Sequence, residues 1–142
     1  MPRKAPSQVR RDLPRAPSRW DSRAVIPGIS GKALAEIARL ERHRYAPGAA
    51  QHALSHWRGV VHGPGPWVIY PRFFSDCPCC DPPWGGEHRR ILEEFLAALP
   101  RPARRELSAV LAPLDARFLA RTLSDPYAAP GDPWWRRRLE SP

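Results

Sequence analysis

Three cysteines within the CPCC segment at 77–80 give this chain its most evident chemical capacity. Cys77 and Cys80 have the C-x-x-C spacing with which two thiolates reach one zinc ion from a tight turn. A tetrahedral site needs two further ligands, and the best candidates are the histidines that flank the segment, His62 and His88. For the metal interpretation, the sequence therefore predicts a zinc site made of Cys77, Cys80, His62 and His88.

Two other interpretations of these thiols compete with the metal site. CPCC also fits the C-P-x-C form of glutaredoxin-like active sites, but that chemistry needs its first cysteine at a helix N-terminus. The DPP sequence at 81–83 prevents such a helix. In the third interpretation the thiols are partly buried, chemically idle small hydrophobic groups. The sequence favours this third interpretation, then metal binding, and then redox chemistry.

CPCC also resembles the opening half of small cysteine-rich zinc modules. Those modules have a second C-x-x-C further along, whereas this chain has no cysteine after Cys80. The resemblance therefore covers half a site, and it does not imply the fold of those modules.

The remaining polar residues do not form a known catalytic pattern. His52 and His56 are spaced i, i+4, which suits metal binding, but Ala53 stands where an H-E-x-x-H motif needs glutamate. The sequence favours two solvated histidines. No G-x-S-x-G, Walker A or G-x-G-x-x-G pattern occurs. We expect a non-enzymatic protein. The alternative is an enzyme with an unrecognised active site near the cysteine segment.

The chain of 142 residues is strongly basic, with 23 Lys and Arg against 14 Asp and Glu and a net charge of +9. Only two of these cations are lysines, and a GC-rich genome accounts for part of that arginine excess. Three cysteines are too few for a disulfide scaffold, and no apolar run approaches the roughly 18–20 residues that a membrane span needs. The odd cysteine count favours reduced thiols and a cytoplasmic location.

The first 29 residues carry seven basic and two acidic side chains and offer little to bury. They lack the apolar stretch of a secretory signal. We expect them to form a disordered basic arm. A WWRRR sequence at 134–138 adds aromatic and cationic groups, which together can stack on bases and contact phosphates. The candidate nucleic-acid contacts are Arg10, Arg11, Arg15, Arg136, Arg137 and Arg138, and the surface candidates for the same partner are Arg39, Arg42, Arg89, Arg90, Arg104 and Arg105.

The tryptophans at 134 and 135 have an alternative role that the sequence favours. An exposed tryptophan pair would create a large apolar surface patch. We therefore expect both to fold back onto the helical core and fix the tail, with the arginines left in water.

Apolar residues at helical spacing predict five short helices. Ser30 is the expected N-cap of the first helix, and Pro113 is expected to break or kink the fourth. The predicted ranges are 30–45, 47–62, 87–99, 102–112 and 114–123. Residues 67–74 form the one credible strand, and because Pro71 interrupts it we expect an edge strand or an extended segment.

These elements predict a mainly α protein, an irregular bundle of about five short helices with a Pro/Gly/Cys-rich central loop. The expected organisation is a disordered basic arm at 1–29, one helical domain at 30–124 and an extended tail at 125–142. The stretch 114–139 resembles the endings of small uncharacterised proteins of GC-rich bacteria. That resemblance implies no activity, and it implies only that the tail belongs to the fold.

Together these features favour a small, basic, non-enzymatic protein that binds an acidic partner, either nucleic acid or an acidic protein. The arm would supply a salt-dependent electrostatic attraction. The alternative is a zinc-binding protein–protein adaptor that uses the Cys77–Cys80 loop.

Overall fold

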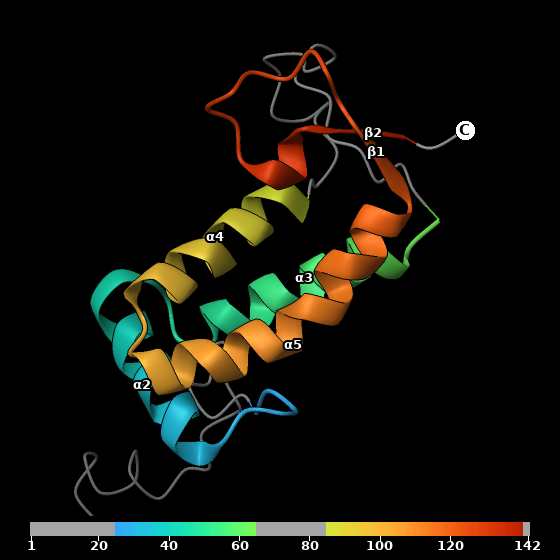
Figure 1. The fold of residues 1–142 in the computed structure, drawn as a ribbon. Coiled ribbons are helices and arrows are strands. Elements are labelled where there is room, and N and C mark those ends of the chain that lie inside the picture. Colours follow the sequence, from blue (N-terminus) through green and yellow to red (C-terminus); the bar gives the residue numbers. More distant parts are fainter. Residues whose placement is uncertain (1–24, 65–84, 141–142) are drawn as a thin grey trace, which may run out of the picture.

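Four α-helices make up most of residues 25–64 and 85–140, which are the residues that the computed structural model describes (Figure 1). The fold class is mainly α, as expected. In chain order the elements are α2 (Gly31–Arg44), α3 (Ala49–His62), α4 (Gly85–Ala98), α5 (Arg101–Ala120), β1 (Thr122–Ser124), the 3₁₀ turn η2 (Trp134–Arg136) and β2 (Arg138–Glu140).

Helix α2 begins where its capping signal predicts. The Ser30 hydroxyl accepts a hydrogen bond from the backbone N–H of Ala33 at 3.3 Å, so it satisfies one of the free donors of the first turn. The helix ends at Arg44 with three basic residues in its last turn, where the negative end of the helix dipole favours them.

Helices α3 and α4 form the most extensive helix pair, and they run antiparallel. Tyr45, the C-cap of α2, lies in the connection to α3 and stacks on Phe95 near the end of α4 at a centroid distance of 4.8 Å. Burial, followed by the hydrogen bond that the Tyr45 hydroxyl donates to Glu94, raises the pKa of Tyr45 to about 12. The shared core of the helices is apolar, and its largest fully buried side chains are Trp57, Phe95, Phe118, Ile26, Leu54, Leu92, Leu99, Leu107, Leu111 and Val61.

The two helices expected at 102–112 and 114–123 form a single helix, so the predicted count of five is wrong and the described chain has four. Pro113 lies inside α5 and is exposed. It removes one backbone hydrogen bond, but the stripe of Leu107, Leu111, Leu114 and Phe118 stays buried on both sides of it. This continuous packing against the other helices outweighs the local cost of the proline.

The packed chain begins before Ser30. Ile26 is 2% exposed and Ile29 is 8% exposed, and both belong to the core. The turn between them needs Gly28, whose φ of +87° suits glycine. The last residues of the predicted basic arm therefore pack against the helices. The rest of that arm, the predicted strand at 67–74 and the cysteine segment lie outside the described residues.

The C-terminal residues fold back on the helices, as the favoured interpretation of the two tryptophans expects. Strands β1 and β2 pair antiparallel with Leu123 opposite Leu139, and η2 lies against the first turn of α4 (Figure 1). Trp135 is 4% exposed, and the Trp134 ring meets Phe118 of α5 edge to face at 6.1 Å. The predicted domain boundary at residue 125 thus falls in the connection between two paired strands, within what we call the C-terminal hairpin (residues 122–140).

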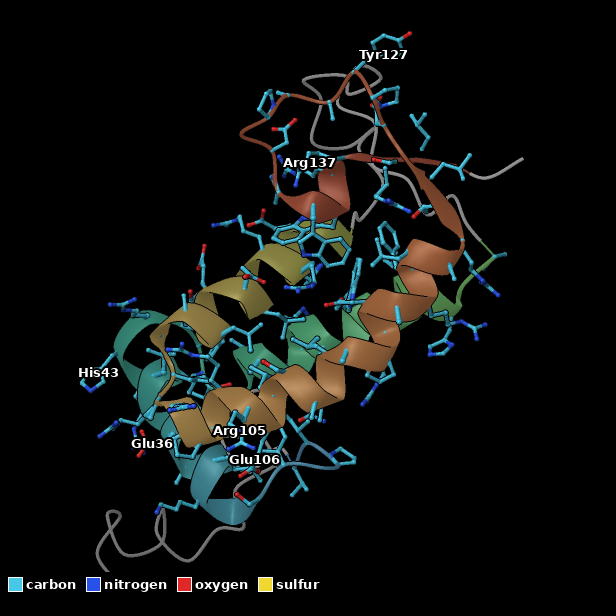
Figure 2. All side chains as sticks on the ribbon, viewed as in Figure 1. Glu36, His43, Arg105, Glu106, Tyr127 and Arg137 are labelled. Carbon is cyan, nitrogen blue, oxygen red and sulfur yellow. The ribbon has the colours of Figure 1, made fainter. Side chains whose placement is uncertain are left out.

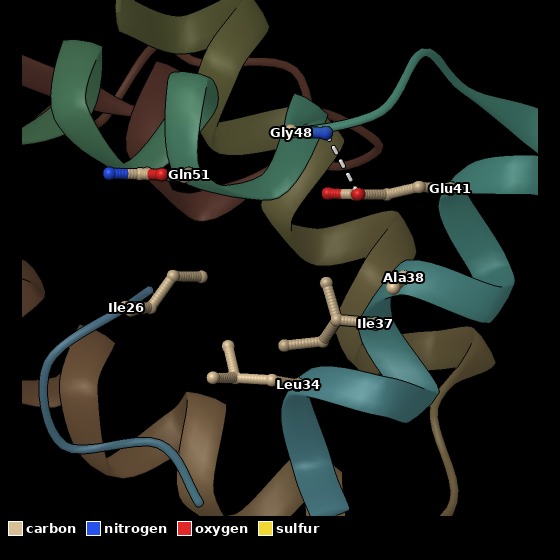
Figure 3. A pocket seen from close by; sticks show the side chains of 7 residues that line it. All are labelled: Ile26, Leu34, Ile37, Ala38, Glu41, Gly48 and Gln51. Atoms are coloured by element: carbon tan, nitrogen blue, oxygen red, sulfur yellow. Dashed lines mark hydrogen bonds between the residues drawn. The ribbon is translucent and has the colours of Figure 1, made fainter. Parts of the chain in front are cut away.

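A buried carboxylate joins α2 to the start of α3. Glu41 is 3% exposed, and one of its oxygens accepts a hydrogen bond from the backbone N–H of Gly48 at 2.8 Å (Figure 3). Its other oxygen accepts a hydrogen bond from the backbone N–H of Ala50 at 3.0 Å. Helix α3 has no side-chain cap and no acidic residue in its first turn. Glu41 therefore supplies, from a neighbouring helix, the negative charge that a helix N-terminus favours.

We expect Glu41→Gln to lower the free energy of unfolding by about 1–3 kcal/mol, because an amide NH₂ would face a buried backbone donor. Glu36→Gln is the matched control, since Glu36 lies on the same helix but forms an exposed pair with Arg39. Urea denaturation measures both variants. Equal stability of the two variants would mean that the Glu41 contacts contribute nothing.

We expect Pro113→Ala to raise the free energy of unfolding by about 1–3 kcal/mol, because it restores the N–H donor to the Ala109 carbonyl. Pro102→Ala is the control, because proline in the first turn of α5 costs no hydrogen bond. Thermal unfolding by circular dichroism compares them. A loss of stability in Pro113→Ala would show instead that the packing of α5 requires the proline.

Candidate functional site

The acidic side chains of the described helices are all engaged within the protein. Glu41 and Asp115 bond to neighbouring helices, and the Glu106 carboxylate accepts hydrogen bonds from the backbone N–H and hydroxyl of Ser30 at 2.6 and 2.9 Å. The others form ion pairs one helical turn apart, which are Glu36 with Arg39, Glu87 and Glu94 with Arg90, and Glu93 with Arg89. The hydrogen bond from Arg90 holds the pKa of Glu87 below its usual value.

Many basic side chains are left without such a partner. Eight exposed cations form neither a hydrogen bond nor a salt bridge through their side chains with any residue that the structure describes. Three lie on α2, three lie on α5, and two lie in and after η2. They are Lys32, Arg42, Arg44, Arg101, Arg105, Arg117, Arg136 and Arg137.

Two of these groups lie on adjoining helices. The bonds from Ser30 to Glu106 join the start of α2 to α5, and Figure 2 shows Arg105 and Glu106 on α5 beside α2. We call the unpaired cations of α2 and of the first two turns of α5 the α2–α5 basic surface, which consists of Lys32, Arg42, Arg44, Arg101 and Arg105. Within this surface, Arg105 lies at the end of the molecule away from Arg137 (Figure 2).

The residues of the WWRRR sequence have different roles, because one of its arginines bonds within the protein and two are exposed. Arg138 donates hydrogen bonds to the Thr122 hydroxyl at 2.9 Å and to the carbonyl oxygens of Leu119 and Thr122, so its guanidinium holds the C-terminal hairpin to the end of α5. Arg136 and Arg137 are exposed. Arg137 also lines, with Trp134, a shallow hollow of about 250 Å³ between the hairpin and α5. The predicted contacts Arg10, Arg11 and Arg15 lie outside the described residues.

The sequence placed Arg89 on the surface, and the structure shows that this was wrong. Arg89 is 3% exposed. Its guanidinium forms a two-pronged pair with Asp115 of α5 at 2.9 and 3.1 Å, and Asp115 also accepts a hydrogen bond at 3.0 Å from the Trp57 indole of α3. The same guanidinium carbon lies 5.3 Å from the ring centroid of Trp134 and 5.0 Å from that of Trp135. We call this group of five residues the Arg89 clasp.

The histidines are arranged differently from the predicted zinc site. The ligand nitrogens of His52, His56 and His88 all lie within 4.8 Å of one another, where α3 faces the first turn of α4. His62 is exposed at the end of α3 and does not belong to this group. Cys77 and Cys80 lie outside the described residues, so a zinc site that combines them with His62 and His88 stays a prediction.

The sequence contained half of the signal for this histidine group. The i, i+4 spacing placed His52 and His56 on one helix face, but their third neighbour comes from another helix. Only the antiparallel pairing of α3 and α4 brings His88 to that face. A histidine in the first turn of the following amphipathic helix is the feature that would have suggested it.

Removal of the Arg89 charge tests the clasp. We expect Arg89→Met to lower the free energy of unfolding by roughly 2–4 kcal/mol, because it leaves the mostly buried Asp115 carboxylate without its cation. Arg90→Met is the matched control and should cost less than about 1 kcal/mol, since the Arg90 pairs are solvent-exposed. Denaturation followed by tryptophan fluorescence compares them. Similar losses in both variants would contradict the structural role of Arg89.

The comparisons with known proteins add no family to this picture. No protein-family model matches the chain, and no curated protein or solved structure matches it either. Among the described helices, none is both long enough and apolar enough to cross a membrane. Function is therefore argued from the residues and their geometry.

Proposed function

We propose that this protein binds nucleic acid through its surface arginines, as a binding protein rather than an enzyme. The observation that carries the proposal is the unequal use of charge. The acidic side chains of the described helices all form bonds within the protein, whereas eight exposed cations have no hydrogen-bonding or ion-pair partner among the described residues. The parts of the surface that carry these cations therefore have a positive local potential.

Arginine suits a phosphate backbone. Its planar guanidinium donates two parallel hydrogen bonds to phosphate oxygens, and it remains charged at any physiological pH. Neutralisation of several phosphates releases counterions from the nucleic acid, which supplies most of the free energy of sequence-independent binding. The α2–α5 basic surface and the arginines at 136 and 137 would each contribute such contacts.

The basic arm would extend these contacts. Seven of its residues are cationic, including Arg10, Arg11 and Arg15. A chain segment rich in charge and poor in apolar residues can follow a nucleic-acid backbone without a fixed shape of its own. We propose that the arm and the folded surface bind the same strand or duplex.

Binding to unrelated duplex DNA, single-stranded DNA and RNA, measured by fluorescence anisotropy at several salt concentrations, tests the proposal. We expect dissociation constants of about 10⁻⁶–10⁻⁴ M for non-specific sites near physiological salt, with steep weakening as salt rises. Absence of binding to all three at about 50 mM salt would remove the proposal.

Three sets of arginine-to-glutamine variants identify the contacts. They are Arg10/Arg11/Arg15 for the arm, Arg101/Arg105 for the α2–α5 basic surface and Arg136/Arg137 for the hairpin. Each phosphate contact that is lost should reduce the slope of log K against log salt by about 0.9. Arg39→Gln is the control, because that side chain is already paired with Glu36. An unchanged slope in all three sets would contradict the proposal.

A further inference from the structure

Three imidazole rings meet at the contact between α3 and α4, outside the surfaces used for the proposed function. The His56 and His88 rings are stacked with centroids 4.2 Å apart, and the His52 centroid lies 4.4 Å from His56 and 5.6 Å from His88. His52 and His56 are exposed and His88 is half-buried. The group is therefore open to solvent on one side and backed by the helix pair on the other.

The spacing of these rings suits a transition-metal ion. Zinc–imidazole bonds of 2.0–2.1 Å place the nitrogens of a tetrahedral site about 3.4 Å apart. The nitrogens here lie within 4.8 Å of one another, so rotation about the Cβ–Cγ bonds can close the difference. That torsion is soft in histidine.

The positions on the helices fix the direction from which each ligand comes. His52 and His56 lie one turn apart on the exposed face of α3, and His88 reaches them from the first turn of α4. Three protein ligands leave a fourth position of a tetrahedral ion facing solvent, which water or an added anion can occupy.

The surrounding charges permit a cation. Arg89 and Arg90, the two residues after His88, are each paired with carboxylates. Glu87 precedes His88 in the same turn, and its carboxylate lies within electrostatic reach of Arg90 and of the exposed Arg136. The Glu87 carboxylate offsets the positive end of the α4 dipole, which would otherwise disfavour a metal ion there.

We infer that His52, His56 and His88 form a binding site for a divalent transition-metal ion, and zinc is the ion that we expect it to bind. Imidazole ligands favour zinc, copper and nickel over magnesium and calcium, which prefer oxygen. The ion would join α3 to α4 across the segment between them. This inference does not depend on nucleic-acid binding, and it uses ligands other than the predicted Cys77 and Cys80.

Titration of the full-length, tag-free protein with Zn²⁺, measured by calorimetry, tests the site. We expect one ion per chain and at least a tenfold loss of affinity in each of His52→Ala, His56→Ala and His88→Ala. His43→Ala is the matched control, because His43 is exposed and lies outside the group, and its affinity should stay within about twofold of the unaltered chain. His62→Ala tells the two sites apart, because His62 is a ligand only of the predicted Cys77–Cys80 site, and we expect this variant to keep its affinity as well.

Two further readouts separate this site from others. Zinc should raise the midpoint of thermal unfolding of the unaltered chain and of the His62→Ala variant, but not of His88→Ala, because only the folded state brings His88 to the α3 pair. The double variant Cys77→Ser/Cys80→Ser should keep its zinc affinity to within about twofold of the unaltered chain.

Two results would overturn the inference. Unchanged affinity in His88→Ala would mean that no site spans the two helices. Loss of zinc binding in the cysteine double variant, with the histidine variants unaffected, would place the metal at the cysteine segment instead. Circular dichroism of each metal-free variant confirms that the helices remain folded.

Discussion

The pairing of Arg89 with Asp115 is the interaction on which the rest of the described structure depends. Arg89 lies on α4, and its guanidinium bonds to Asp115 of α5. The same carboxylate accepts a hydrogen bond from Trp57 of α3. The guanidinium also lies against the rings of Trp134 and Trp135 in the C-terminal hairpin. A buried guanidinium is costly unless it is paired and hydrogen-bonded, and the Arg89 guanidinium bonds to Asp115 of α5 and to Glu93 of its own helix. Separation of α4 from α5 would therefore leave a buried charge without its partner, and the contacts of Asp115 with Trp57 and of Arg89 with the two tryptophans of η2 add α3 and the hairpin to the same group. The apolar core supplies most of the stability, and this ion pair favours one arrangement of the helices over other ways of packing the same apolar surfaces.

The same use of charge determines what the surface presents. Asp115 and Glu41 are turned inward, one toward Arg89 and the other toward the start of α3, and the remaining helical carboxylates each hold an arginine or Ser30. The protein has fewer acidic than basic residues. After these bonds have formed, unpaired cations therefore remain on α2, on α5 and around η2. The positive surface is thus partly a consequence of how the fold is held together. An arginine count alone could not have shown this, because Arg89 and Arg138 are structural whereas Arg101 and Arg105 are not.

The helices were predictable wherever an apolar stripe and a local capping signal agree. Ser30 begins α2 and the stripe through Ala50, Leu54 and Trp57 defines α3, because both signals act within one element. Pro113 was misjudged because the burial that keeps α5 continuous comes from other helices. Arg89 was misjudged for the same reason, since its spacing to Glu93 is that of an ordinary surface pair while its stronger partner is Asp115, far away in sequence. The histidine group followed from neither rule, because it exists only after α3 and α4 have paired.

The first turn of α4 carries both of the features that local sequence could not reveal. His88 points to the exposed face of α3 and Arg89, the next residue, points into the clasp. Adjacent residues on a helix face different directions, so one turn can serve a solvent-facing ligand group and a buried ion pair without conflict. An ion held between α3 and His88 would fix the position of this turn, and the turn in turn positions the guanidinium beneath the hairpin. Metal binding at the α3–α4 contact would therefore favour the docked hairpin and hold Arg136 and Arg137 in place on the surface proposed to meet nucleic acid.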